Sequence, residues 1–268
     1  MLLSVIIPTY KRNDLLSLCL EALQPSSQTI DSQYYEVIVT DDSPNYEAKS
    51  LVENTFPWAK WKEGPHRGPA ANRNNGAKFS RGEWIVFIDD DCIPDKMILQ
   101  TYYNAILKGN YDAFEGLINA DRPQERFDEE SPLNLEGGCF WSCNIAVSKN
   151  MFDLLEGFDE GFPFPAMEDV DFHERLKKVA RLKFLESAKV IHPWRRVKPF
   201  KSYKKRIASH QYLIKKNNIK KNLNFRFKRI KIFVSVFIKH TKLLYKYSFK
   251  GVGVYFETLW SRILMIFV

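Results

Sequence analysis

Three consecutive aspartates, Asp89, Asp90 and Asp91, directly follow the apolar run 84–88. Adjacent carboxylates repel one another, so a chain that ends a buried strand in this way needs a compensating cation nearby. Carboxylate oxygens are the ligands of hard divalent ions such as Mg²⁺ and Mn²⁺, which often bind the phosphates of a substrate as well. The triplet therefore indicates a metal-dependent enzyme that acts on a phosphorylated donor; a solvated turn is the alternative.

Two other apolar runs end at polar residues in the same way. Residues 3–7 lead into Tyr10, and residues 37–40 lead into Asp41. Helical patterns separate the runs, at residues 14–23, 46–54 and 70–79. The order β-α-β-α-α-β, with near-continuous β-branched runs, predicts parallel strands buried on both faces. Ligands gather at the carboxyl ends of such strands, so we expect Tyr10, Asp41 and the aspartate triplet to converge on one ligand.

Five stretches, in order along the chain, resemble the signatures of the family 2 glycosyltransferases. They are VIIPTYKR at 5–12, VTDDS at 39–43, GPAANRNNG at 68–76, FIDDD at 87–91 and MEDVDFHERL at 167–176. That family has the GT-A fold and transfers a sugar from a nucleotide-sugar with inversion at the anomeric carbon. The resemblance therefore implies an α/β fold with a Rossmann-like, mostly parallel nucleotide-binding sheet.

The resemblance implies a pocket for the nucleotide base at the first two strand ends. Pro8 lines it through its backbone and Tyr10 packs against the base, unless Tyr10 is an aromatic residue of the core. Asp41 accepts the imide N–H of uracil. Asp42 is expected to cap the following turn or helix, because an aspartate there satisfies free backbone N–H groups.

The resemblance also implies a metal and diphosphate site. Asp91 is the principal ligand of Mn²⁺ or Mg²⁺, Asp89 shares or orients the ion and contacts the donor, and Asp90 faces the ribose. Arg73 either holds the diphosphate or braces the aspartates, because a guanidinium forks onto phosphate or carboxylate oxygens; a helix-surface arginine is the alternative. His192 lies where many GT-A enzymes place a histidine near the metal, with a purely structural histidine as the alternative.

A carboxylate must take the proton from the acceptor hydroxyl, because inverting transfer is a single displacement; the effect is worth about 10²- to 10⁴-fold in rate. Asp169 matches the family's base, with a cap of the helix expected at 170–179 as the alternative. Glu168 beside it is assigned to the acceptor. Trp141, in the glycine-containing stretch 135–147, is the candidate for stacking on an acceptor sugar, with core packing as the alternative.

Charge divides the 268-residue chain into two parts. Residues 1–194 carry 31 acidic and 20 basic side chains, whereas residues 195–250 carry 19 basic side chains and no acidic one. We expect a GT-A catalytic domain at 1–194, with a donor half at about 1–120 and an acceptor half at about 121–194. A basic, amphipathic helical region follows at 195–268.

The tail interleaves cations with apolar residues, as in FRFKRIKIFV at 225–234, and no segment of it is long enough to span a bilayer. This pattern suits a helix at an anionic membrane surface, with a solvated face or a homodimer contact as the alternative. Nucleic-acid binding is disfavoured, because the aspartates would repel a polyanion. The polar stretch 121–131 is expected to be a mobile loop.

The sequence also bears on the cellular compartment. Four cysteines, with no paired zinc spacing at Cys139 and Cys143, suit a reducing environment. The first strand begins almost at Met1, which leaves no room for a signal peptide. We expect a cytoplasmic protein that is peripheral on the inner face of the membrane.

These features predict an inverting, metal-dependent, hexosyltransferase-type enzyme. Its donor is a nucleotide-sugar, UDP-linked, and its acceptor is a hydroxyl of a glycan or lipid-linked glycan in cell-surface polysaccharide or glycolipid synthesis. The alternative is a sugar nucleotidyltransferase or a nucleotide-sugar-binding protein on the same fold. Those proteins carry a glycine-rich phosphate loop with a basic residue after the first strand, whereas this chain has Pro8-Thr9-Tyr10 there.

Overall fold

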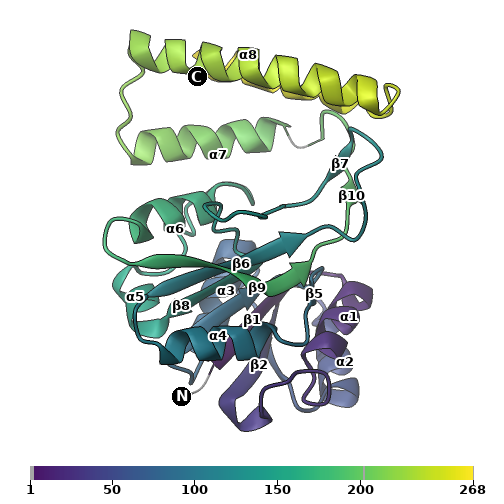
Figure 1. The fold of residues 1–268 in the computed structure, drawn as a ribbon, viewed down its shortest axis with the longest axis vertical. Helices are drawn as coiled ribbons and strands as arrows, with labels where there is room; N and C mark the ends of the chain where they lie inside the picture. Colours follow the sequence, from purple (N-terminus) through teal and green to yellow (C-terminus); the bar gives the residue numbers. More distant parts are fainter. Residues whose placement is uncertain (1–2, 202, 268) are drawn as a thin grey trace. The chain divides into compact units, whose positions relative to one another are not determined.

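The computed structural model describes residues 3–201 and 203–267, and the chain divides into two compact units (Figure 1). The sheet unit comprises Met1–Asp121, Pro132–Gly161 and Glu168–Pro193. The helical unit comprises Arg122–Ser131, Phe162–Met167 and Trp194–Val268. Two short segments that the sequence placed in the acceptor half, 122–131 and 162–167, thus belong with the tail.

The described residues of the sheet unit form an eight-stranded sheet in the order β3-β2-β1-β4-β8-β6-β9-β5. The strands are β1 (Leu3–Thr9), β2 (Tyr35–Asp41), β3 (Lys60–Glu63), β4 (Trp84–Ile88), β5 (Ile93–Pro94), β6 (Ala113–Asn119), β8 (Asn144–Ser148) and β9 (Leu182–Ile191). Strands β3, β2, β1 and β4 are parallel neighbours, as are β6 and β9, while β8 runs antiparallel to β4 and β6. The predicted α/β fold with a mostly parallel sheet is confirmed.

Helices cover both faces of this sheet. Helices α1 (Asn13–Leu23), α2 (Glu47–Thr55) and α4 (Ile98–Leu107) share one apolar core with one face, and α3 (Pro69–Lys78), α5 (Lys149–Leu154) and α6 (Glu168–Leu176) share a second core with the other. Val5 and Ile7 belong to the first core and Ile6 to the second. Because alternate side chains of β1 enter opposite cores, the strand reads as one continuous apolar run. A short 3₁₀ helix, η1 (Ser32–Tyr34), precedes β2.

The sequence prediction misses β3 and misplaces α6. Strand β3 has the sequence KWKE and lies at the edge of the sheet, where its side chains are only partly buried, so it has no apolar run to reveal it. The true order of the first elements is therefore β-α-β-α-β-α-β. Helix α6 begins at Glu168 instead of residue 170 and ends at Leu176.

Strand β9 carries a bulge opposite β6. The register changes between two adjacent pairs, Gly116 with Leu185 and Leu117 with Lys189. Residues 186–188 therefore have no partner of their own in β6. The side-chain amide of Asn144, on β8, donates to the carbonyl of Leu117 at 3.0 Å and to the carbonyl of Ala188 at 2.9 Å. This amide satisfies backbone groups that the bulge leaves outside the ladder.

The helical unit contains α7 (Tyr203–Lys216), α8 (Leu223–Lys246) and α9 (Val252–Phe267), together with a ribbon of β7 (Glu129–Glu130) and β10 (Arg195–Arg196). The helical tail is thus confirmed. Its small core is formed by Phe127, Leu244, Tyr247, Val254 and Tyr255. Residues 121–131 are not a free loop, because Phe127 is buried in this core and β7 pairs with β10. Among the described helices, none has both the length and the apolar composition that a membrane crossing requires.

Candidate active site

The aspartate triplet lies at the end of β4, beside the end of β1. Asp90 is fully buried, and its carboxylate accepts the hydroxyl of Thr9 at 2.7 Å and pairs with the guanidinium of Arg12 at 2.6 Å. Burial raises the pKa of Asp90 to about 7, against the opposing effect of Arg12 and Thr9. The side chain is enclosed, and its contact with the ribose stays a prediction.

Arg12 is a site residue for which the sequence analysis predicted no role. Its Nη1 lies 2.8 Å from Asp91, so one guanidinium bridges Asp90 and Asp91. This arginine supplies part of the positive charge that three adjacent carboxylates require. The signal was present in the sequence, since Arg12 follows the first strand and therefore lies at the same sheet edge as the triplet.

Arg73 connects Asp89, the first aspartate of the triplet, to α6. Helix α3 begins with Pro69 at its first position, where the missing N–H costs nothing, and carries Arg73 into the interior. Its Nη2 donates to Asp89 at 2.6 Å, and its Nη1 lies 3.6 Å from Glu168. Burial alone would lower the pKa of Arg73, but the charges of Asp89 and Glu168 raise it. Arg73 therefore braces the carboxylates from within and is not a helix-surface arginine.

The first turn of α6 carries the predicted base. Asp169 is partly buried, and its carboxylate accepts the N–H of Val170 at 2.8 Å. Burial, followed by the neighbouring charge of Glu168, raises the pKa of Asp169 to about 7, while Arg73 opposes the shift. A general base works best when its pKa lies near the working pH. The carboxylate of Asp169 therefore has the chemistry of a base at neutral pH.

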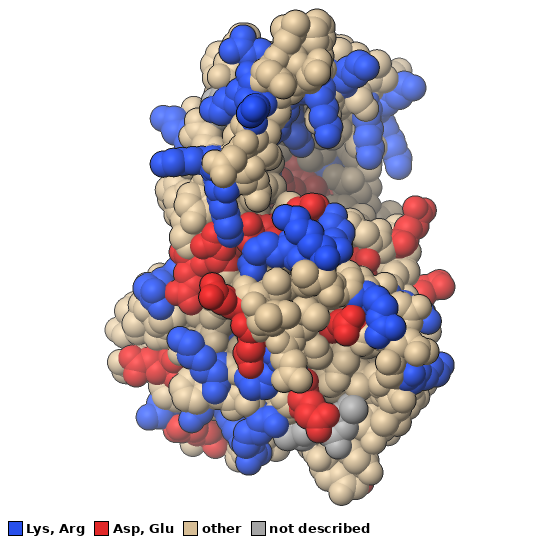
Figure 2. Space-filling view, turned by 90° about the vertical axis from the view of Figure 1, so that its left-hand side faces the viewer, with Lys and Arg blue, Asp and Glu red and all other residues tan. Residues whose placement is uncertain are grey.

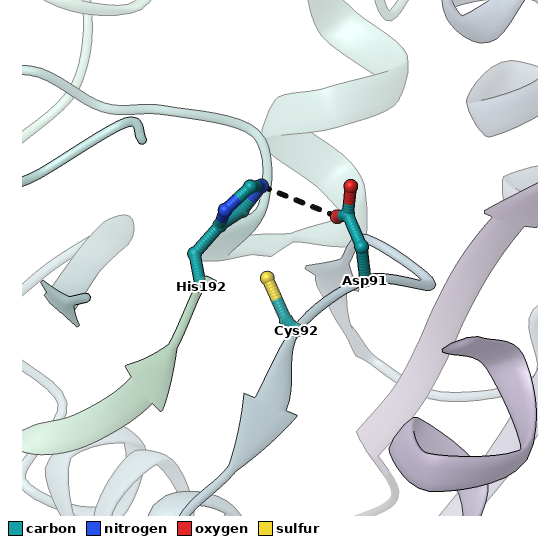
Figure 3. Close-up of side chains that lie close together, drawn as sticks. All are labelled: Asp91, Cys92 and His192. Atoms are coloured by element: carbon teal, nitrogen blue, oxygen red, sulfur yellow. Dashed lines mark ion pairs between the residues drawn. The ribbon is translucent and has the colours of Figure 1, made fainter. Parts of the chain in front are cut away.

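Asp91, Cys92 and His192 point toward one another from two elements, the turn after β4 and the end of β9 (Figure 3). The Nε2 of His192 lies 3.2 Å from Oδ1 of Asp91, and its Nδ1 lies 3.0 Å from the carbonyl of Pro193. Burial lowers the pKa of His192, but the hydrogen bond and charge of Asp91 outweigh it and raise the pKa. A carbonyl only accepts hydrogen bonds, so Nδ1 donates its proton to Pro193. This second contact is the one by which proteins orient metal-binding histidines. The donor set fits a divalent cation.

The side chains of Asp41, the last residue of β2, and of Asp42 accept hydrogen bonds from backbone N–H groups. These roles differ from the prediction. The oxygens of Asp41 accept the N–H groups of Ser43 and Ala48, both at 2.9 Å, which fixes the start of α2. Asp42 instead accepts the N–H groups of His66 and Gly68, both at 2.8 Å. Asp41, and not Asp42, therefore accepts an N–H group in the first turn of α2, whose N-cap residue is Tyr46. Asp41 is fully buried, and its contact with uracil stays a prediction.

The remaining predicted residues occupy different environments. Tyr10 is 53% exposed with Lys11 near its ring, so it is not a core aromatic and remains available to a base. Pro8 is buried in β1 opposite Thr40. Trp141 is partly buried against the main core, and its stacking on an acceptor stays a prediction.

Glu115 is a second residue that the sequence analysis missed. Its buried carboxylate accepts the N–H groups of Gly138, Cys139 and Phe140 at 2.6, 3.1 and 2.9 Å. The ring of Phe140 stacks on His173 of α6 with centroids 5.0 Å apart. One carboxylate thus fixes the loop before Trp141 and, through Phe140, its packing on the helix that carries Asp169. A glutamate inside the apolar run 113–118 was the available signal, because a buried charge requires partners.

Known proteins resemble this chain in sequence and in fold. Residues 4–154 match the model of the family described as Glycosyl transferase family 2. An uncharacterized glycosyltransferase of Haemophilus influenzae is 31% identical over 186 residues, which cover 64% of this chain and 60% of that protein. A poly(ribitol-phosphate) beta-glucosyltransferase of Bacillus spizizenii is 30% identical over 49% of this chain and 22% of its own length. The chain thus spans less than two thirds of these relatives.

The fold also resembles a solved structure, S. aureus TarS 1-349 in complex with UDP-GlcNAc. The TM-score is 0.57 with 22% identity, and the match covers 80% of this chain and 67% of that one. At this identity the likeness concerns the fold alone. The family match covers more than half of the chain and includes the ends of β1, β2 and β4. The protein belongs to glycosyl transferase family 2.

Proposed function

We propose that this protein is an inverting, metal-dependent glycosyltransferase that moves a sugar from a UDP-linked nucleotide-sugar to a hydroxyl of a glycan or lipid-linked glycan. The observation that carries the proposal is Asp169, a carboxylate with a pKa raised to about 7, connected through Glu168 and Arg73 to the aspartates at the end of β4. The complex of TarS with UDP-GlcNAc supports a UDP-sugar donor. The relative named for poly(ribitol-phosphate) supports a hydroxyl-bearing surface polymer as the acceptor class.

Each residue of the site has a separate task in this proposal. Asp91 and His192 hold Mn²⁺ or Mg²⁺ with a contribution from Asp89, and the ion, when bound, neutralises the charge of the departing nucleoside diphosphate. Asp169 takes the proton of the acceptor hydroxyl as the new bond forms. Glu168 orients the acceptor beside it. Arg73 keeps the carboxylates at their positions and prevents them from repelling one another.

The test uses the purified full chain and a panel of nucleotide-sugars. We expect release of the nucleoside diphosphate with one UDP-sugar in Mn²⁺, faster when the acceptor is present, and loss of release in EDTA. Undiminished transfer in EDTA would contradict the metal dependence. Exchange of pyrophosphate into the nucleotide-sugar, without release of the diphosphate, would favour the sugar nucleotidyltransferase instead. NMR of the product reports whether the anomeric configuration is inverted.

A second part of the proposal concerns the helical unit, which we infer to be a peripheral anchor at the inner face of the membrane. Five exposed apolar residues of α8 follow one another at spacings of three and four: Leu223, Phe227, Ile230, Val234 and Phe237. This spacing puts them on one face of the helix. Lys and Arg side chains gather over the helices at the top of Figure 2, interrupted by uncharged surface.

An apolar stripe flanked by cations suits an anionic lipid surface, because the stripe enters the acyl boundary while the cations remain at the headgroups. A homodimer through the same stripe is the alternative, and light scattering of the full chain distinguishes the two. An anchor of this kind would bring the enzyme to a lipid-linked acceptor. Nucleic acid is not proposed as a partner.

A further inference from the structure

Cys92 adds a sulfur to the cluster formed by Asp91 and His192. One ligand atom from each of the three residues lies within 4.8 Å of the other two. The three side chains converge in Figure 3, with the sulfur between the imidazole and the carboxylate. Cys92 is 1% exposed and His192 is 3% exposed, whereas the side chain of Asp91 is 11% exposed.

These separations suit a small, tetrahedral cation. Zinc lies about 2.3 Å from sulfur and about 2.0 to 2.2 Å from nitrogen and oxygen, which puts tetrahedral ligands about 3.3 to 3.7 Å apart. The Nε2 of His192 and Oδ1 of Asp91 are already 3.2 Å apart. The sulfur lies within 4.8 Å of both atoms, so the side chains have to move closer together before all three contact one ion. Three protein ligands with a fourth position left for water or substrate are also the pattern of catalytic zinc sites.

We propose that Cys92 is a third protein ligand of this site, so that Asp91, Cys92 and His192 together bind a thiophilic divalent cation, Zn²⁺ or Co²⁺. The inference rests on the proposed metal-binding role of Asp91 and His192 and adds selectivity to it. Hard ions such as Mn²⁺ use the carboxylates and the imidazole, whereas a softer ion also recruits the sulfur. Cys92 therefore sets the preference of the site for Zn²⁺ over Mn²⁺.

Binding of Zn²⁺ replaces the thiol proton of Cys92 with the metal ion. The thiol of Cys92 now makes a 3.8 Å contact to the carbonyl of Cys143, with the carbonyl as acceptor. On binding Zn²⁺, the S–H bond breaks, its proton passes to solvent and the thiolate donates an electron pair to the ion. No oxidant or reductant takes part. The thiol is the reason that this cluster differs from one built only of oxygen and nitrogen ligands.

The experiment titrates Co²⁺ into the full chain and records the near-ultraviolet band of sulfur-to-cobalt charge transfer. We expect the band in the native chain, its loss in Cys92→Ser and its retention in Cys139→Ser, a matched change at a cysteine outside the cluster. Competition with a chromophoric chelator should show at least a tenfold loss of Zn²⁺ affinity in Cys92→Ser, with a much smaller change for Mn²⁺. Circular dichroism checks that each variant is folded.

Three results would overturn the inference: Co²⁺ that fails to bind, Co²⁺ that binds without the band, or a band that persists in Cys92→Ser. Should Cys92→Ser not fold, X-ray absorption of the native chain with Zn²⁺ decides, through a sulfur neighbour at about 2.3 Å that is kept in Cys139→Ser. Failure of the proposed function is separable from these outcomes. A chain that shows the cobalt band but releases no diphosphate from any nucleotide-sugar keeps the Cys92 site and loses the transferase.

Discussion

Arg73 and Asp89 lie 2.6 Å apart, and the pair joins α3 to the end of β4, with the arginine nearly buried and the aspartate 24% exposed. The second nitrogen of the same guanidinium lies 3.6 Å from Glu168, at the start of α6. One buried cation therefore faces two carboxylates from different elements. It links the strand end that carries the aspartates to the helix that carries Asp169.

Removing that cation should destabilise the fold strongly. Arg73→Met keeps most of the side-chain volume but leaves Asp89 and Glu168 without their buried partner, which we expect to cost about 3–5 kcal/mol of unfolding free energy. Denaturant unfolding measures the loss. Arg67→Met is the control, because its pair with Glu160 lies at the surface and is worth less than about 1 kcal/mol. Equal losses in the two variants would contradict the bracing role.

Asp169→Asn should separate donor binding from chemistry. The amide keeps the shape but accepts no proton, so turnover should fall by at least about 10²-fold while donor affinity changes little. In the native enzyme only the ionised carboxylate acts as a base, so kcat/KM should fall as the pH drops through about 7, the pKa of Asp169. If the variant lost donor affinity but turned over normally once saturated, the base would lie elsewhere.

Asp91→Asn should weaken Mn²⁺ binding by at least about tenfold and reduce transfer to a similar or larger degree, because the ion loses a charged ligand. Electron paramagnetic resonance counts the free Mn²⁺ directly. Asp153→Asn removes a carboxylate of the same type from an exposed position on α5 and should leave both quantities unchanged. Unchanged Mn²⁺ affinity in Asp91→Asn would rule out Asp91 as the main ligand.

Glu115→Gln should loosen the loop before Trp141. A neutral amide oxygen accepts more weakly than a carboxylate, and the NH₂ group cannot replace an acceptor for three backbone N–H groups, so we expect a loss of about 1–3 kcal/mol. The KM for the acceptor should rise more than the KM for the donor. Glu53→Gln, at an exposed position of α2, is the control. A purely structural Glu115 would lower stability and leave the acceptor KM unchanged.

Three changes on the α8 stripe test the anchor. Phe227, Val234 and Phe237 replaced together by serine should abolish co-sedimentation with anionic vesicles, because the exposed apolar surface is lost while the cations remain. Serine at Leu107, Leu154 and Val179, three exposed apolar positions of the sheet unit, is the matched control. The native chain should detach as salt shortens the screening distance to about 8 Å. Retained binding by the stripe variant would refute the anchor.

The parallel core of the fold could be predicted because its strands are buried on both faces. The run 84–88 coincides with β4, and the helices expected at 14–23 and 46–54 correspond to α1 and α2 within one residue. Strand β3 was not predicted, because an edge strand needs no apolar run. The pairing of 122–131 with the tail was not predicted, because contacts between residues far apart in sequence leave no local periodicity.

The candidate site, like the fold, could be predicted from the sequence only in part. The convergence of Tyr10, Asp41 and the aspartate triplet at one edge was expected because the carboxyl ends of parallel strands meet there, whereas His192 was expected there only from the family resemblance. The assignment of individual hydrogen bonds does not follow from strand order. Which of Asp41 and Asp42 accepts an N–H group of α2 depends on the path of the loop that returns at Gly68. Such a path is fixed by tertiary contacts and not by spacing.

The bulge in β9 makes the sheet sensitive to insertions and deletions at a place where it tolerates substitutions. Residues 186–188 add an odd number of positions before His192, and successive side chains of a strand point to opposite faces. Deleting or inserting one residue there would reverse the direction of every later side chain of β9 and turn His192 away from Asp91. Exposed positions such as Glu186 should accept substitution. Among natural relatives, gaps should therefore be absent from this segment even where its residues vary freely.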